Sequence, residues 1–190
     1  QVEKKLEETE HHDIPYYGYG IKPFTLSMIE AATHIAGNNL TPDIITEIIK
    51  LGKDMLSHQV EVLDGTEKVL QTLNGRYQLV VATKGDLRDQ KRKLQKSGLL
   101  QYFNHVEIMS DKKPDDYLKI LEKLDCRAEN FLMIVNSLRS DILPVLELGG
   151  KAIHIPFSVT WEHEMVEGDI VHPNLKKVDN IAQILSLFDS

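Results

Sequence analysis

Residues 80–86 read Val-Val-Ala-Thr-Lys-Gly-Asp, and residues 134–141 read Ile-Val-Asn-Ser-Leu-Arg-Ser-Asp. Each stretch is an apolar run that stops abruptly at small polar residues and then continues as a helical pattern. Parallel strands of open α/β folds have this pattern, because their carboxyl ends carry polar groups to the sheet edge where ligands bind. The two stretches therefore predict two such strands and a ligand site at their ends.

The chain from about residue 60 onward alternates between strand and helix patterns. We expect four strands, at Tyr77–Thr83, His105–Met109, Phe131–Val135 and Lys151–Ile155. One helix is expected after Gly65 and ends at Leu73. Further helices are expected at Leu87–Lys96, Pro114–Leu124, Ser140–Leu148 and Asn180–Leu187. Repeated strand–helix units with short connections predict an α/β fold with a doubly wound parallel sheet.

The first 60 residues have helical patterns and no strand pattern. Apolar residues recur at helical spacing over Thr25–Ala36, and Thr41 with Pro42 marks the start of another helix that continues to Leu51. Between the charged start of the chain and these helices, residues 11–20 are rich in aromatic residues and glycine, which predicts a loop. We therefore expect a helical region at 1–60 and an α/β region at 61–190.

The chain has 190 residues, a net charge of −7 and one cysteine, Cys126. A chain of this length buries roughly 70% of its unfolded surface without the help of disulfides. Interspersed charges argue against a nucleic-acid partner, and no apolar run approaches the roughly 20 residues that span a bilayer. We expect a cytoplasmic monomer or homodimer with no nucleic-acid or membrane partner.

The first polar cluster is Thr83, Lys84 and Gly85. Glycine adopts backbone angles that turn amide hydrogens toward an anion, and the start of the following helix adds its positive dipole end. The Thr83 hydroxyl can donate to a phosphoryl oxygen. The alternative interpretation is that Thr83 only caps the next helix.

A second cluster, Ser110 to Lys113, follows the strand at His105–Met109. A lysine at this position can neutralise charge that develops on a transferred phosphoryl group. Lys112 and Lys113 are both candidates, and the alternative is that both are solvated surface residues.

Asn136 and Asp141 form the third cluster. Mg²⁺ prefers oxygen ligands, and here an amide carbonyl and a carboxylate follow the same strand. Asp141 would act on the metal directly or through a bound water. The alternative is an Asx turn with an acid that favours the helix dipole.

Together these residues resemble the haloacid dehalogenase-like (HAD) hydrolase superfamily, by motif over about residues 60–190 and by a helical cap over 1–60. The resemblance implies that Thr83 is the hydroxyl residue of the second motif and that Lys112 is the lysine of the third. It also implies that Asn136, Ser137 and Asp141 form the fourth motif. Lys84, Gly85 and Ser137 would then bind substrate.

Two details qualify the resemblance. Lys112 is preferred over Lys113 because its five-residue lead to Tyr117 fits family members of this type. Val135 stands where the family usually has glycine. Here the sequence departs from the family pattern, in which the glycine allows a close backbone approach.

The first family motif, an Asp-x-Asp on the central strand, is absent from the sequence. Residues 1–6 resemble the first cap helix, which in relatives begins shortly after the nucleophile. We therefore expect about twenty residues to precede Gln1 in the intact protein, and this chain alone to be inactive. Without that strand, buried backbone groups lose their partners at a cost of roughly 1–3 kcal/mol each.

The resemblance implies a Mg²⁺-dependent phosphatase that cleaves a small phosphate monoester through an aspartyl-phosphate. Tyr16, Tyr17, Tyr19 and Lys22 would lie near the cap loop that closes over the leaving group. Three alternatives remain: a metal-independent 2-haloacid dehalogenase, a non-catalytic interaction module, and a phosphoacceptor receiver domain. The receiver is the weakest, because it has no helical cap and is shorter.

Overall fold

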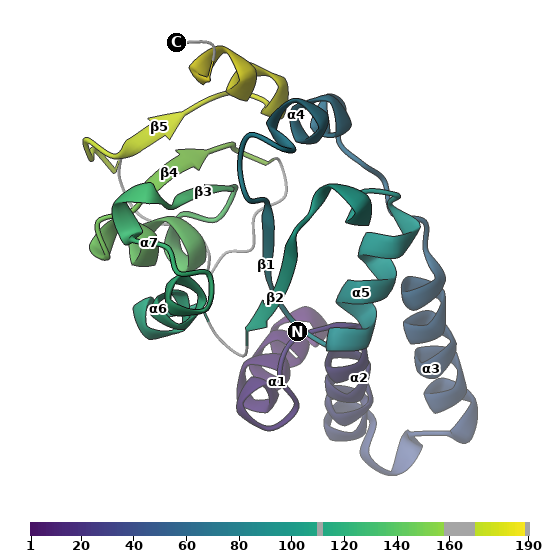
Figure 1. The fold of residues 1–190 in the computed structure, drawn as a ribbon. Coiled ribbons are helices and arrows are strands. Elements are labelled where there is room, and N and C mark those ends of the chain that lie inside the picture. The colour runs from purple at the N-terminus through teal and green to yellow at the C-terminus, as the bar shows by residue number, and fades with distance from the viewer. Residues whose placement is uncertain (110–111, 158–169, 189–190) are drawn as a thin grey trace. The chain divides into compact units, whose positions relative to one another are not determined.

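The structure is a computed structural model, and it describes residues 1–109, 112–157 and 170–188 (Figure 1). The chain divides into two units, one made of Gln1–Glu61 with Ala82–Leu100 and the other of Val62–Val81 with Gln101–Ser190. Strand β1 (Val80–Lys84) crosses this division, so that its first two residues belong to the second unit and its last three to the first.

The first unit is built on helices α1 (Val2–Tyr17), α2 (Ile21–Ala36), α3 (Pro42–Ser57) and α5 (Leu87–Lys96), with a short 3₁₀ turn η1 (Gly37–Asn39). α1 packs on α2, and α2 packs on α3 (Figure 1). The expected start of α3 is confirmed, because Pro42 is its first residue and the Thr41 hydroxyl accepts a hydrogen bond from the Ile44 N–H at 3.4 Å.

The loop predicted at residues 11–20 is wrong over most of its length. α1 continues to Tyr17, and only Gly18 to Gly20 break the helix. Tyr16 and Tyr17, on the last turn of α1, are exposed, and Tyr16 is 73% exposed. Tertiary packing supports this helical turn, since the buried Asp13 accepts a 2.7 Å hydrogen bond from Ser27 of α2.

The second unit contains the strands other than the end of β1, together with helices that cover them. β1 pairs with β2 (His105–Met109), while β3 (Leu132–Val135), β4 (Lys151–His154) and β5 (Leu175–Lys177) form a separate three-stranded group in that order. Both pairings of the second group are parallel, with Met133 opposite Ala152 and Ile153 opposite Lys176. Among the described residues, the strands thus form two groups rather than one continuous sheet.

Helical segments cover both faces of the three-stranded group. Ile153 packs in a buried cluster with Val69 and Leu73 of α4 (Thr66–Leu73) and Ile184 of the 3₁₀ helix η6 (Ile181–Leu187). Its neighbour Ala152 packs with Ile142 and Leu146, which lie in η4 (Leu138–Ile142) and α7 (Leu143–Glu147). Because successive side chains of a strand point to opposite faces, the two clusters lie on opposite sides of β4. The expected doubly wound α/β architecture is confirmed.

Several predicted bounds agree closely with the structure and a few differ. β2 and α5 have the predicted bounds, and α6 (Pro114–Lys123) ends one residue early. The helix predicted at Ser140–Leu148 is a π turn, η4, followed by the short helix α7. In η4 the Ile142 N–H donates to the Ser137 carbonyl, five residues back, at 3.3 Å.

Two further differences concern the end of the chain. The helix predicted at Asn180–Leu187 is the 3₁₀ helix η6, which the Asn180 side chain caps by accepting from the Gln183 N–H. β5 was not predicted, because its three residues include two exposed lysines. Such a short, charged segment is typical of an edge strand. No helix in the described ranges has both the length and the apolar character that crossing a bilayer requires.

The contact between α2 and α3 depends on a glycine. A Cβ atom placed on Gly52 would lie 2.3 Å from the Thr25 Oγ1 atom and 2.9 Å from Thr25 Cγ2. Gly52 is a buried helical residue. Its missing side chain lets the two helices approach closely, and its backbone freedom is not used.

We therefore expect Gly52→Ala to lower the free energy of unfolding by about 1–3 kcal/mol, because the methyl group overpacks the helix crossing. At an open helical position the same change would stabilise by roughly 0.5–1 kcal/mol. Chemical denaturation followed by far-UV circular dichroism measures the change. The double variant Gly52→Ala/Thr25→Ala removes the nearest clashing atoms and should recover stability; no recovery would show that the cost has another origin.

Candidate active site

A buried ion pair joins two of the predicted site residues in the second unit. Lys112 Nζ lies 2.5 Å from Asp141 Oδ1, and their side chains are 13% and 6% exposed. Tyr117, which is fully buried, donates a 2.6 Å hydrogen bond to the same oxygen. A buried carboxylate is costly unless it is paired and hydrogen-bonded, and both conditions are met at Asp141.

Local backbone structure holds Asp141 in this position. Ser137 is the residue before the π turn η4, and its hydroxyl accepts a hydrogen bond from the Ser140 N–H at 3.1 Å. Ser140 in turn offers its carbonyl to the Tyr117 hydroxyl at 3.5 Å. Ser137 and Asp141 are both buried, so the turn that contains them holds the Asp141 carboxylate beside Lys112.

The two candidate lysines occupy different environments. Lys113 is exposed and is the residue that begins α6, where its backbone N–H donates to the Asp116 carboxylate at 3.4 Å. Lys112 is the one that contacts Asp141. The contact favours Lys112 as the functional lysine. Ser110 and Asp111, the other members of that cluster, lie outside the described residues.

Asn136 directly follows β3, at the carboxyl end of the strand. Its backbone carbonyl lies 3.0 Å from His154 Nε2, at the end of the neighbouring strand β4, as expected if the ring N–H donates to it. The residue itself is exposed at the strand end. An amide oxygen in such a place fits one ligand position of a hard cation such as Mg²⁺.

The remaining predicted residues, Thr83, Lys84 and Gly85, lie at the end of β1 in the first unit. Their convergence with Lys112 and Asn136 on one anion therefore stays a prediction. Thr83 does not cap α5. The Asp86 side chain does so by accepting from the Asp89 N–H at 3.0 Å, while the Thr83 hydroxyl donates to the Lys84 carbonyl at 3.3 Å.

The loop after α1 packs against this strand end. The Lys84 ammonium lies 4.3 Å from the centre of the Tyr19 ring, and Lys22 forms a 2.9 Å ion pair with Asp86. Gly85 has a φ of +123°, a left-handed conformation that favours glycine, and a Cβ atom there would lie 3.1 Å from the Gln90 side chain. The packing of residues 19–22 on residues 84–86 was not predictable, because no local pattern links the two segments.

Charge contacts set the pKa of Asp86. The Lys22 side chain, which donates a hydrogen bond to the carboxylate, holds the pKa of Asp86 below its usual range, and the Asp89 N–H acts in the same direction. Since the pKa is lower in the folded protein, the associated stabilisation is present above the usual titration range of aspartate. It is lost as the pH falls through the folded pKa.

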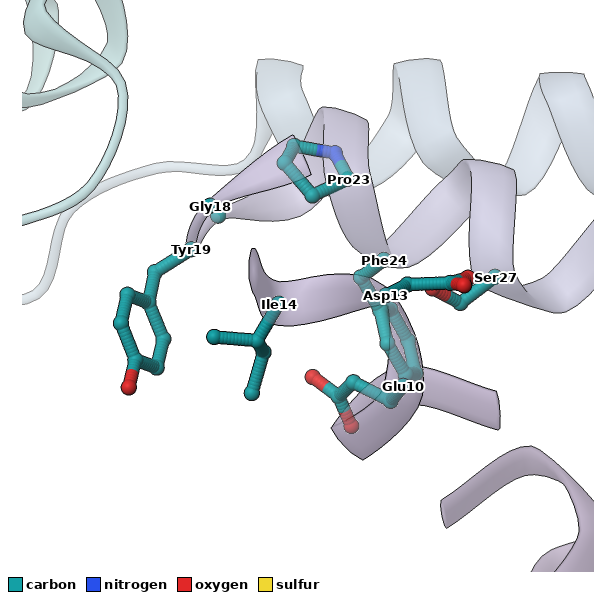
Figure 2. Close-up of a pocket in the computed structure, with 9 residues that line it drawn as sticks. Glu10, Asp13, Ile14, Gly18, Tyr19, Pro23, Phe24 and Ser27 are labelled. Atoms are coloured by element: carbon teal, nitrogen blue, oxygen red, sulfur yellow. The ribbon is translucent and has the colours of Figure 1, made fainter. Parts of the chain in front are cut away.

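A small hollow lies within the first unit (Figure 2). Glu10, Asp13 and Ile14 line it from α1, and Pro23, Phe24 and Ser27 from α2, with Gly18 to Gly20 between them. The pKa of the Glu10 carboxyl is raised, mainly because burial disfavours its charged form. This hollow belongs to the helical unit and contains none of the residues predicted from the strand ends.

Comparison with known proteins gives the family. Residues 18–153 match the family of haloacid dehalogenase-like hydrolases. The chain belongs to this family. No curated protein sequence matches the chain.

Solved structures agree with this assignment. A haloacid dehalogenase-like family hydrolase from Xanthomonas campestris is 34% identical, with a TM-score of 0.87 over 97% of this chain and 74% of that one. A 2-haloacid dehalogenase from Pseudomonas syringae pv. Tomato DC3000 is 17% identical (TM-score 0.67, 99% of this chain and 79% of that one). A predicted phosphoglycolate phosphatase from Haemophilus somnus 129pt is 14% identical (TM-score 0.64, 98% and 88%). The last two identities show only a shared fold.

Family membership confirms the resemblance, the α/β fold and hydrolase chemistry in general terms. The individual assignments of Thr83, Lys112, Asp141, Asn136 and the substrate-binding residues stay predictions. Sequence reasoning used Tyr117 only as a spacing marker. Its complete burial and its bond to Asp141 show a second donor that no local pattern indicated.

We expect Lys112→Met to lower the free energy of unfolding by about 3–5 kcal/mol, because it leaves the Asp141 carboxylate buried without its cation. Urea denaturation measures the loss. Lys113→Met is the matched control and should change stability by no more than about 0.5 kcal/mol. The double variant Lys112→Met/Asp141→Asn should recover part of the loss; equal effects of the two lysine variants would contradict the pairing.

We also expect Lys22→Met to raise the pKa of Asp86 toward its usual range, because the variant removes the charged donor. Titration of the Asp86 carboxyl by NMR measures the shift. Lys91→Met, an exposed lysine on α5, is the control. A pKa that stays low in Lys22→Met would mean that the Asp89 N–H alone depresses it.

Proposed function

We propose that this chain forms the cap and core of a Mg²⁺-dependent phosphatase that cleaves a small phosphate monoester. The observation that carries the proposal is the buried pair of Lys112 and Asp141, with Asp141 five residues after the exposed Asn136. Such a pair holds an ammonium group in one place, and a fixed cation is what a developing phosphoryl charge requires.

Each residue has a defined task in this proposal. Lys112 and the Thr83 hydroxyl bind phosphoryl oxygens, while Lys84, Gly85 and Ser137 contribute to substrate binding around them. Asp141 and Tyr117 hold Lys112 in position. Asn136 presents an oxygen ligand to the metal.

The donor set partly fits Mg²⁺. Mg²⁺ binding sites use one or two carboxylates with other oxygens, and Asn136 is an exposed residue whose side chain carries an amide oxygen. Oδ1 of Asp141 is already engaged by Lys112 and Tyr117, which favours its action on the lysine over direct ligation. When bound, the metal supplies positive charge that screens the phosphate.

The nucleophile of the proposed reaction is absent from this sequence, which contains no two aspartates separated by one residue. We infer that a strand carrying that pair completes the sheet, since the strands of the described residues form two separate groups. An aspartate oxygen would attack phosphorus as the bond to the leaving oxygen breaks, and the second aspartate would protonate that oxygen. Water then hydrolyses the aspartyl-phosphate.

The proposed domains are a helical cap at 1–60 and an α/β core at 61–190. The cap loop with Tyr16, Tyr17, Tyr19 and Lys22 would close over the leaving group and exclude water. Ile14, Pro23 and Phe24 give the cap hollow an apolar part. We propose a small-molecule phosphate ester as the partner, and a cytoplasmic monomer or homodimer as the working form.

Dehalogenation of a 2-haloacid is the second candidate, and the fold shared with the Pseudomonas syringae enzyme supports it. A non-catalytic module is the third, because this sequence lacks the nucleophile pair. The dehalogenase would release chloride without Mg²⁺, and the non-catalytic module would show no turnover, so both can be told apart from a phosphatase.

The test is hydrolysis of p-nitrophenyl phosphate and of a panel of metabolite phosphates with Mg²⁺. The protein tested is a longer polypeptide that carries the nucleophile strand, native or taken from the Xanthomonas relative. We expect turnover that EDTA abolishes and that Lys112→Ala and Asn136→Ala each lower by about 10²-fold or more. Lys113→Ala is the matched control and should retain activity, and the 190-residue chain alone should be inactive.

Chloride release from 2-chloropropionate without metal would replace the phosphatase by the dehalogenase. No turnover of any substrate by the longer polypeptide would favour the non-catalytic module.

A further inference from the structure

A second group of metal-ligating side chains lies in the first unit, away from the strand ends. His12 and Asp13 of α1 and Glu30 of α2 each offer one ligand atom, and these three atoms all lie within 4.8 Å of one another. Helices α1 and α2 pack against each other, and the three residues lie across their contact. We propose that His12, Asp13 and Glu30 bind a divalent transition-metal ion that joins α1 to α2.

Asp13 is the buried member of the group. It is 3% exposed, and its carboxylate contacts the Ser27 hydroxyl and the His12 imidazole. A buried carboxylate without a full positive charge beside it is unfavourable, so a cation at this position would stabilise it. Glu10, one helical turn away, lines the same hollow as Asp13 (Figure 2).

The distances suit a metal. Tetrahedral Zn²⁺ with ligands near 2.0–2.1 Å places two ligand atoms about 3.3 Å apart. His12 Nδ1 and Asp13 Oδ1 are 3.3 Å apart. Glu30 has a flexible side chain that is 39% exposed and contacts His34 at 3.7 Å, so that its carboxylate can close the remaining distance.

A supporting hydrogen bond is already in place. Ser27 donates to Asp13 Oδ2 at 2.7 Å, which leaves Oδ1 directed at His12. Metal-bound carboxylates in proteins commonly carry such an outer hydrogen bond, which orients the ligand. Figure 2 shows Ser27 meeting Asp13 from the neighbouring helix.

The ligand types select the metal. Imidazole nitrogen with carboxylate oxygens suits Zn²⁺ and its transition-metal neighbours, whereas Mg²⁺ prefers oxygen ligands alone. This site is therefore chemically distinct from the proposed Mg²⁺ position at Asn136, and it does not depend on the proposed reaction.

The experiment is isothermal titration of the metal-free 190-residue chain with Zn²⁺ in the presence of excess Mg²⁺. We expect one saturable site. His12→Gln and Glu30→Gln should each weaken Zn²⁺ binding by at least about tenfold, because even outer-shell partners of a metal contribute that much. His11→Gln, the neighbouring histidine on the same helix, is the matched control and should bind like the parent chain.

A second measurement guards against misfolded variants. His12 is 69% exposed and Glu30 is 39% exposed, so glutamine at either position leaves the core intact, and circular dichroism verifies the helices. Zn²⁺ should raise the thermal midpoint of the parent chain and not that of His12→Gln/Glu30→Gln. No saturable site, or equal weakening in His11→Gln, would overturn the proposal and leave His12 and Asp13 as an ordinary hydrogen-bonded pair.

Discussion

The buried carboxylate of Asp141 is the constraint on which the candidate active site depends. A charge at 6% exposure is stable only if a cation and a donor accompany it, and Lys112 and Tyr117 meet that need at one oxygen. The pair links the segment after β2 to the turn after β3, and it thereby fixes the ammonium group beside the strand end. Lys112 and Asp141 therefore serve both the stability of the buried charge and the proposed chemistry.

The sheet explains why this carboxylate is buried. β4 presents Ile153 to one layer of helices and Ala152 to the other, so both faces are covered. Ile142, beside Asp141 in the π turn, is fully buried in the second of these layers. Packing of Ile142 draws the turn into the core and takes Asp141 with it, which is why an acid near a helix start is buried rather than solvated.

The helical unit follows a different rule. Its helices meet through small and polar residues: Gly52 against Thr25, and Ser27 against Asp13. Gly52 and Thr25 allow α3 to approach α2 closely, whereas the hydrogen bond from Ser27 to Asp13 makes the α1–α2 contact polar. The hollow and the proposed transition-metal site both lie at the α1–α2 contact. The loop after α1 then reaches the β1 end through Lys22 and Tyr19.

The sequence by itself determined the fold class and the family, because runs such as Val80–Lys84 and Leu132–Val135 stop at polar residues in a strand–helix rhythm that few folds share. It also placed α5 and β2 at their true bounds, since Asp86 is a local cap and Met109 ends a local apolar run. Local signals failed where distant contacts decide. The helix through Tyr17 is supported by Ser27, the π turn at Leu138–Ile142 accompanies burial of Ile142, and β5 exists only by pairing with β4. The preference for Lys112 over Lys113 came from its spacing to Tyr117, which the family resemblance implies. The contact of Lys112 with Asp141, which no local pattern indicated, gives that preference a physical reason.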